Sequence, residues 1–191
     1  MEYIIVIISS YLMGSIPFGF ILTKIYLKKD IRNIGSGNIG ATNALRTGNK
    51  LIGFTTLLFD IVKAIAPLIY IKFNYTEYIF IASLSVFLGH VFPVWLKFKG
   101  GKGVATYLGI LISLNLIYGF FFIVVWLVTF LISKYSSLSS IIASLSIPIY
   151  IIIFNDNNLI FYLIIFILIF FTHRENVKRL KNKEESKSQI Y

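Results

Sequence analysis

Long apolar runs decide what this chain can fold into. A bilayer offers no water to the backbone, so only helices or closed barrels can cross it. The 191 residues contain seven apolar segments, at 3–27, 51–71, 78–96, 104–114, 117–133, 141–154 and 159–171. The first three are long enough to cross a hydrocarbon layer about 30 Å thick as helices. The sequence therefore predicts an all-α, polytopic transmembrane helical bundle with about seven spans, the short ones included.

Three of these segments are short for a membrane span. Segments 104–114, 141–154 and 159–171 have 11, 14 and 13 residues, and at about 1.5 Å per residue each covers only part of the hydrocarbon layer. Short helices imply irregular backbone at membrane depth, which is tolerated where it lines a cavity filled by protein or water. A five-span arrangement with re-entrant segments fits the same sequence.

Positive charges alternate between rich and poor connections. Lysine and arginine number five in residues 28–50, three in 97–103 and six in 172–191, but one in 72–77 and none in 115–116. The positive-inside rule then puts the N-terminus outside and the C-terminus in the cytoplasm. On this orientation the unusual polar motifs all face the cytoplasm.

Charge also divides the chain along its length. We expect a single membrane domain at 1–180 and a basic polar tail at 181–191. No lysine or arginine precedes the first apolar run, so that run should stay in the membrane rather than act as a cleaved signal peptide. The connection 155–158 carries no positive charge and should lie on the outer face.

Composition excludes several functions. Apolar residues make up 57% of the chain, against about 45–50% in soluble domains. Cysteine is absent, and two histidines and eight dispersed carboxylates predict neither a metal site nor a cofactor. The net charge of +10 lies beside apolar segments, which favours basic loops on an anionic lipid leaflet over nucleic-acid binding.

The first polar motif runs from Gly35 to Arg46. Its short amide and hydroxyl side chains lose little entropy on binding, and the guanidinium of Arg46 can hold a phosphate through two parallel hydrogen bonds. The candidate phosphate-binding residues are Ser36, Asn38, Gly40, Thr42, Asn43 and Arg46. An ordinary polar loop that ends in a helix cap is the alternative.

The second motif runs from Gly89 to Thr106 and contains a Gly-Gly-Lys-Gly turn. Glycines let successive N–H groups point into one concavity, and the helix expected after the turn adds an N-terminus that favours an anion. The candidates are Gly100, Gly101 and Gly103 as phosphate ligands and Lys102 as a catalytic residue. The Gly-Lys-Ser/Thr frame of a nucleotide-binding loop is missing, so ATP hydrolysis is not predicted.

The third motif follows the last apolar segment. If it is helical, His173 and Asn176 share one face. Histidine suits the removal of a hydroxyl proton near neutral pH, and Asn176 would orient it or bind substrate. A solvated basic helix beside the membrane is the alternative. Ser137, in the serine-rich connection 134–140, is a further candidate phosphate donor, and a plain hydrophilic turn is its alternative.

Two charged residues lie inside the second apolar segment. Asp60 and Lys63 are about one helical turn apart, and intramembrane charges are functional suspects by default. Because the two can neutralise each other, we favour a structural pair. His90 is expected to be a buried structural histidine bonded to a carbonyl, with a role in shaping the site as the alternative.

Together these motifs resemble a bacterial family of membrane glycerol-3-phosphate acyltransferases that depend on acyl phosphate. The family motifs are similar to Ser36-x-Asn38-x-Gly40-x-x-Asn43-x-x-Arg46, to Gly89-His90-x-Phe92-Pro93 with Gly100-Gly101-Lys102-Gly103-Val104-Ala105-Thr106, and to His173-x-x-Asn176-x-x-Arg179-Leu180 followed by Gly-x-Glu. Gly14-Ser-Ile-Pro17 and Asp60-x-x-Lys63 are similar too. The family glycine near the C-terminus is Lys183 here, while Glu185, expected to be structural, is in place.

The resemblance implies a reaction. A fatty acyl group moves from acyl phosphate to the 1-hydroxyl of sn-glycerol 3-phosphate, giving lysophosphatidate and phosphate, the first step of phospholipid synthesis. The implied setting is a bacterial inner membrane with the site on its cytoplasmic face, where the enzyme that forms acyl phosphate could hand it over. A phosphate transporter and a noncatalytic scaffold are the rival classes.

The resemblance also suggests roles for the candidate residues. We expect the turn 100–103 and Ser36 to hold the donor phosphate, and Arg46, Lys102, His173 and Asn176 to hold glycerol 3-phosphate. His173 is the leading base, against direct proton transfer to a phosphate oxygen of the substrate.

Overall fold

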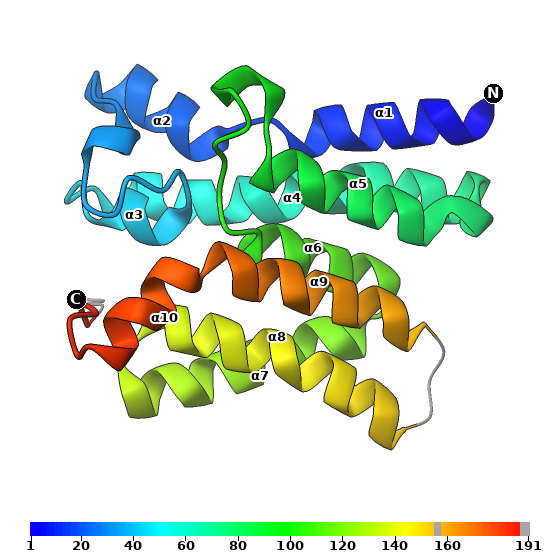
Figure 1. The fold of residues 1–191 in the computed structure, drawn as a ribbon. Coiled ribbons are helices and arrows are strands. Elements are labelled where there is room, and N and C mark those ends of the chain that lie inside the picture. Colours follow the sequence, from blue (N-terminus) through cyan, green and yellow to red (C-terminus); the bar gives the residue numbers. More distant parts are fainter. Residues whose placement is uncertain (155–157, 188–191) are drawn as a thin grey trace. The chain divides into compact units, whose positions relative to one another are not determined.

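The computed structural model describes residues 1–154 and 158–187, and every regular element among them is helical (Figure 1). The predicted all-α class is thereby confirmed. The chain divides into two compact units, residues 1–113 and 114–191, and each is described by itself. Most of the predicted connection 155–158 and the end of the predicted tail 181–191 lie outside the described residues.

The elements follow the predicted apolar segments closely. Those of the first unit are α1 (Glu2–Gly14), α2 (Phe18–Leu27), η1 (Ile31–Asn33), α3 (Ala41–Leu45), α4 (Lys50–Asn74), η2 (Thr76–Tyr78), α5 (Ile79–Val91), η3 (Val94–Leu96) and α6 (Val104–Leu114), whose last residue falls in the second unit. Those of the second unit are α7 (Leu116–Ser133), α8 (Ser136–Ile153), α9 (Leu159–Thr172) and α10 (Arg174–Lys181).

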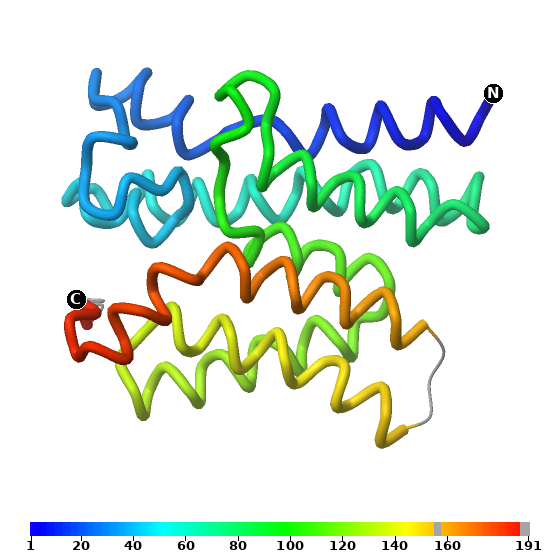
Figure 2. The backbone as a smooth tube through the Cα atoms, in the orientation of Figure 1, coloured from blue at the N-terminus to red at the C-terminus, as the bar shows by residue number. Residues whose placement is uncertain are grey.

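The first apolar segment is interrupted between α1 and α2. Pro17 has no N–H to donate and disfavours a helical conformation in the residue before it, so the helix stops short of the proline. The tube in Figure 2 follows the chain through this break. Glu2–Leu27 still forms a single candidate span of 26 residues. The break matters because backbone carbonyls inside the span no longer accept helical hydrogen bonds and can bind other groups.

Small residues bring α1 and α5 close together. A Cβ atom on Gly14 would collide with the backbone of Val86, and a Cβ atom on Gly89 would collide with the backbone of Tyr11. Such contacts between backbones are typical of membrane helices, which pack through small residues. The residue after Gly89 is His90, so this packing holds His90 beside the interrupted first span.

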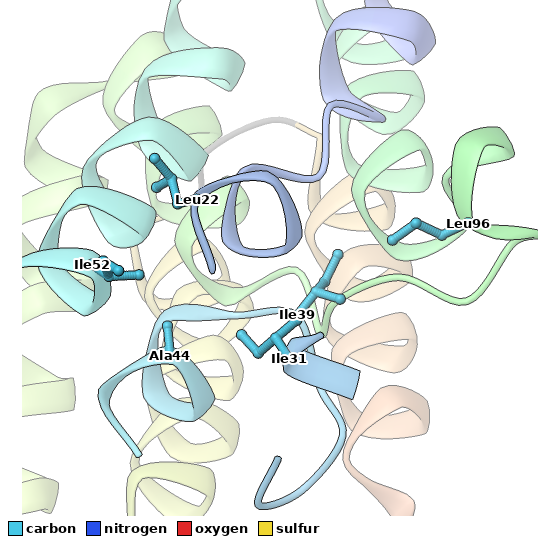
Figure 3. Close-up of a cluster of buried hydrophobic side chains, with 6 residues drawn as sticks. All are labelled: Leu22, Ile31, Ile39, Ala44, Ile52 and Leu96. Carbon is cyan, nitrogen blue, oxygen red and sulfur yellow. The ribbon is translucent and has the colours of Figure 1, made fainter. Parts of the chain in front are cut away.

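The first two polar motifs share one hydrophobic core. Six buried side chains from segments far apart in the sequence form a cluster, drawn in Figure 3, of Leu22, Ile31, Ile39, Ala44, Ile52 and Leu96. Ile39 and Ala44 belong to the first motif and Leu96 to the second. Burial of these side chains therefore fixes both motifs against α2 and the start of α4.

The connection between α7 and α8 is shorter than predicted. Helix α8 begins at Ser136, so Lys134 and Tyr135 alone join the two helices, with Lys134 in the left-handed region at φ 64°. The helix itself satisfies hydroxyls such as those of Ser139 and Ser140, which donate to carbonyls one turn back, each at 2.8 Å. The connection predicted at 134–140, and with it the plain turn that was the alternative for Ser137, is therefore wrong, and α8 reaches 18 residues.

Length and composition limit the number of membrane spans. Within the described residues, five helical segments are long and apolar enough to cross a membrane, and a sixth is added if α9 and α10, bent by 60°, count as one span. Helix α6 is apolar but only 11 residues long. The predicted seven segments are thus all helical, and five or six of them qualify as spans. The orientation of the termini stays a prediction.

Candidate active site

Asn43 is the internal brace of the first motif. Its side-chain amide donates to the carbonyls of Ile31, Ile34 and Asn38 at 3.2, 2.9 and 2.8 Å, and its Oδ1 accepts from the N–H of Ser36 at 3.0 Å. The residue is 2% exposed. These bonds occupy the amide that we predicted to bind phosphate, so Asn43 shapes the loop from inside.

The other candidates of the first motif lie nearer the surface. Ser36, Thr42 and Arg46 are exposed, and Asn38 and Gly40 are half-buried. Oδ1 of Asn38 accepts from the N–H of Gly40 at 2.9 Å, at the residue that precedes α3. The motif therefore combines a braced interior with an exposed polar rim, and the rim holds its one arginine.

The glycine turn of the second motif closes onto α5. The N–H of Gly100 donates to the carbonyl of Val91 at 3.0 Å, and that of Gly101 donates to the carbonyl of His90 at 3.1 Å. The prediction that these N–H groups point into an anion pocket is therefore wrong for this structure, because the end of α5 uses them. The N-terminus of α6, which begins just after Gly103, carries the backbone donors that its own helix leaves unbonded.

A charged cluster lies buried beneath this turn. The Lys63 ammonium is 2.8 Å from Oδ1 of Asp60, 2.9 Å from Nδ1 of His90 and 2.7 Å from the carbonyl of Ile16, which the break in the first span leaves available. The three side chains are at most 3% exposed. The predicted pair of Asp60 and Lys63 is thus part of a larger cluster, and His90 contacts Lys63 where we expected a carbonyl.

Lys63 fixes the tautomer of His90. An ammonium group can only donate, so Nδ1 of His90 accepts and its proton lies on Nε2. Nε2 lies against Gly101, because a Cβ atom on that glycine would overlap it. The cluster therefore touches the glycine turn directly.

Two further hydrogen bonds hold the segment after α5 to α1. The hydroxyl of Tyr11 donates to the carbonyl of Phe92 at 2.6 Å, and the indole of Trp95 donates to Oγ of Ser15 at 2.8 Å. Trp95 thereby ties η3 to the interrupted first span.

His173 lies at the bend between α9 and α10. The residue is 2% exposed, and its Nδ1 is 2.8 Å from the carbonyl of Ile169. A carbonyl can only accept, so Nδ1 carries the proton and Nε2 is the nitrogen with a lone pair. This is the tautomer that a proton-accepting histidine requires.

Glu185 gathers three side chains of the second unit. Its Oε1 accepts from Ser137 at 2.7 Å and from Asn176 at 2.6 Å, while its Oε2 accepts from Nε of Arg179 at 2.7 Å. Burial opposes ionisation, but these three donors outweigh it, so the pKa of Glu185 lies below its usual 4.5. Packing therefore continues into the tail that we placed at 181–191.

A helix-terminating turn brings Glu185 back to α10. The N–H of Lys183 donates to the carbonyl of Leu180 at 3.1 Å, and that of Glu184 donates to the carbonyl of Arg179 at 2.8 Å. This pair of bonds defines a Schellman motif, whose penultimate residue takes a left-handed conformation and is usually glycine. Lys183 occupies that position at φ 61°. The turn expected of the family glycine is thus formed with lysine.

The candidate residues fall into one group in each unit. The first unit holds the exposed rim of the first motif, the glycine turn with Lys102 and the charged cluster, and the second holds His173, Asn176, Ser137 and Glu185. Sequence reasoning assigned no role to Arg179 or to the carbonyl of Ile16, although the charge of Arg179 and the proline after Ile16 were signals for both. Among the described residues, no group of three or more histidines and carboxylates could hold a metal ion.

Comparisons with known proteins agree over nearly the whole chain. Residues 4–183 match the family model described as glycerol-3-phosphate acyltransferase. A glycerol-3-phosphate acyltransferase of Pelagibacter ubique (strain HTCC1062) is 73% identical over 191 residues, covering all of both chains. One of Rhodopseudomonas palustris (strain HaA2) is 49% identical over 187 residues, covering 97% of this chain and 95% of the relative.

Two crystal structures are also similar. Both are of PlsY, an integral membrane glycerol 3-phosphate acyltransferase, one in its glycerol 3-phosphate form and one in its lysophosphatidic acid form. The first has a TM-score of 0.91 at 35% identity and covers 98% of this chain and 96% of that chain. The second has a TM-score of 0.88 at 34% identity, with coverage of 98% and 95%.

Proposed function

Because this chain belongs to the glycerol-3-phosphate acyltransferase family, we propose that it moves a fatty acyl group from acyl phosphate to the 1-hydroxyl of sn-glycerol 3-phosphate. The products are lysophosphatidate and inorganic phosphate. The family membership confirms the resemblance that the motifs indicated, and with it the class of integral membrane acyltransferase. The use of acyl phosphate as the donor is what we propose beyond family membership.

An acyl phosphate suits the residues that the chain provides. It is a mixed anhydride and is already activated, so transfer requires no nucleophilic cysteine, metal ion or nucleotide. The protein has to align two phosphorylated substrates, offset their repulsion and remove one proton. The cationic candidates Arg46 and Lys102 and the start of α6 supply positive potential for that task.

The observation that supports the proposed proton transfer is the hydrogen bond from Nδ1 of His173 to the carbonyl of Ile169. It leaves Nε2 as the proton acceptor. In the proposed step Nε2 takes the proton of the 1-hydroxyl while the hydroxyl oxygen bonds to the acyl carbon. The bond from that carbon to the phosphate oxygen then breaks, and phosphate leaves with the electron pair.

The remaining candidates hold the two substrates. Lys102 and the N-terminus of α6 stabilise the charge of the departing phosphate, together with Ser36. For the phosphate of the acceptor, the candidates are Arg46 and Lys102 in the first unit and Asn176 in the second. The hydroxyl of Ser137 donates to Glu185, so Ser137 supports Asn176 through that carboxylate in place of the direct phosphate contact we predicted.

The setting we propose is the inner membrane of a bacterium. The alternation of connections rich and poor in lysine and arginine supports a cytoplasmic position for the candidate residues, where water-soluble glycerol 3-phosphate is available. The acyl phosphate, as an amphiphile, reaches the site from the lipid side or from the enzyme that forms it.

A direct assay tests the proposal. Purified protein in detergent receives palmitoyl phosphate and radiolabelled glycerol 3-phosphate, and lysophosphatidate is separated from the substrate by extraction into organic solvent. We expect labelled lysophosphatidate and one phosphate released per product. Parallel reactions with palmitoyl coenzyme A or an acylated carrier protein should give none. Transfer from either of these donors, without transfer from acyl phosphate, would overturn the proposal.

A further inference from the structure

The buried charges of the first unit do more than neutralise each other. Lys63 has three N–H bonds, and three acceptors lie within 2.9 Å of its nitrogen: Asp60 on its own helix, His90 on α5 and the carbonyl of Ile16 in the interrupted first span. The three acceptors belong to three different elements. One ammonium group therefore fixes α4, α5 and the break between α1 and α2 to one another.

Stability is a weak reason for such a cluster. Removing two charges from water costs several kcal/mol per ion, and a well-packed apolar replacement is often as stable as a buried ion pair. What a hydrogen-bonded charge provides is direction, since each bond restricts the orientation of its partner. Such a cluster is therefore expected to hold a neighbouring group in one orientation.

The group held in this way is the glycine turn at residues 100–103. Gly101 receives two contacts from one residue, because its N–H donates to the carbonyl of His90 and its Cα lies against Nε2 of the same side chain. The hydrogen bond to the carbonyl of His90 fixes the position of the Gly101 backbone along α5. The ring of His90 fills the space beside the Cα atom of Gly101 and so restricts its orientation. Lys102 is the next residue in the chain. The orientation of the His90 ring therefore also restricts the backbone of Lys102, from which its side chain extends.

We propose that Asp60, Lys63 and His90 form a positioning cluster for Lys102. The inference rests on the proposed function, in which Lys102 stabilises the departing phosphate. Lys63 holds the ring of His90 through Nδ1, and the ring holds the glycine turn through Gly101. Oδ1 of Asp60, 2.8 Å from the Lys63 nitrogen, is the ionic partner of Lys63. The three side chains act through the turn and touch neither substrate.

The test compares two neutralised ion pairs. The double variant Asp60→Asn with Lys63→Met removes the buried charges while nearly keeping side-chain volume. Its matched control, Asp30→Asn with Arg32→Met, removes an exposed ion pair of the same unit whose side-chain atoms are 2.6 Å apart. Each is assayed with acyl phosphate and glycerol 3-phosphate, and thermal unfolding in detergent is recorded for the same preparations.

We expect the buried double variant to stay folded and to lose at least tenfold in kcat. Inhibition by inorganic phosphate should weaken by a similar factor, because Lys102 would no longer be aimed at it. The exposed control should keep kcat within twofold. A buried variant with a lower unfolding temperature but an unchanged kcat and unchanged phosphate inhibition would overturn the inference.

A second variant covers the case in which the double variant does not fold. Gly101→Ala keeps the side chains of Asp60, Lys63 and His90 but forces the turn and the His90 ring apart, because its methyl group would overlap Nε2 of His90. It should reproduce the fall in kcat, and full activity would count against positioning through His90. Failure of the wild-type enzyme to use acyl phosphate would instead remove the proposed function, so the two failures are distinguishable.

Discussion

The side-chain amide of Asn176 donates to Oε1 of Glu185 over 2.6 Å. This contact joins a residue predicted to bind substrate to one that lies nine positions further along the chain, beyond the end of α10. The same carboxylate accepts from Ser137 of α8 and Arg179 of α10. Glu185 thereby ties the helix that follows His173 to a neighbouring helix of its unit.

The first prediction concerns the pH dependence of this contact. The pKa of Glu185 is lower in the folded protein than its usual 4.5, so folding favours the ionised form. Its stabilisation should be fully present above pH 4.5 and should be lost as the pH falls through the lower, folded-state value. Glu185→Gln should reduce the free energy of unfolding at pH 7 by about 1–3 kcal/mol.

Chemical unfolding in detergent from pH 7 to pH 3 measures this effect. The difference between wild type and Glu185→Gln should shrink below pH 4.5. Glu184→Gln is the matched control, because Glu184 is exposed, and it should follow the wild-type curve. A difference that stays constant down to pH 3 would contradict an ionised Glu185 as the source of stability.

The second prediction concerns the backbone at Lys183. A left-handed conformation costs an L-residue about 1–2 kcal/mol, and glycine escapes this cost but loses about 0.5–1 kcal/mol in extra unfolded-state entropy. Lys183→Gly should therefore stabilise the protein by about 0.5–1 kcal/mol and raise the unfolding temperature by about 2–4 °C at most. Lys183→Ala removes the same charge and keeps the Cβ atom. Equal gains from both variants would assign the effect to charge and refute the backbone explanation.

The apolar segments predicted most of the fold, since membrane helices are specified by local hydrophobicity. Hydrogen bonds between distant residues could not be predicted in the same way. Asp60 and Lys63 were paired from their spacing, but His90 joins them from 27 positions away because of how α1 and α5 pack. Similarly, Gly100 and Gly101 have the composition of an anion loop, and the end of α5 takes their N–H groups.

The third prediction separates the interior of the first motif from its rim. Asn43→Asp replaces an amide that donates to three carbonyls by a carboxylate that would repel them. Each lost buried bond costs about 1–3 kcal/mol, so the loop should open locally. Limited proteolysis should then cut within residues 28–50. Asn33→Asp in the same loop changes an exposed residue and should leave the digestion pattern unchanged. Resistance of both variants to the protease would argue against Asn43 as the brace.

The fourth prediction concerns the choice of lysine in the glycine turn. Lys102 is half-buried and Lys99 is exposed, although the two are only three positions apart in the sequence. Lys102→Ala should reduce kcat to near the background rate, because the departing phosphate loses its positive partner. Lys99→Ala should retain most of the activity. Substantial transfer by Lys102→Ala, measured as lysophosphatidate formed per minute, would exclude its proposed role.

The last prediction tests whether His173 moves a proton. His173→Gln keeps a side chain that can donate a hydrogen bond to the carbonyl of Ile169, but it has no basic nitrogen. General-base catalysis contributes about 10²–10⁴ to the rate, so kcat should fall at least hundredfold while the KM for glycerol 3-phosphate changes less. Arg174→Gln, at the exposed next position, is the control and should keep kcat. An unchanged kcat with a raised KM would mean that His173 only binds substrate and that a phosphate oxygen takes the proton.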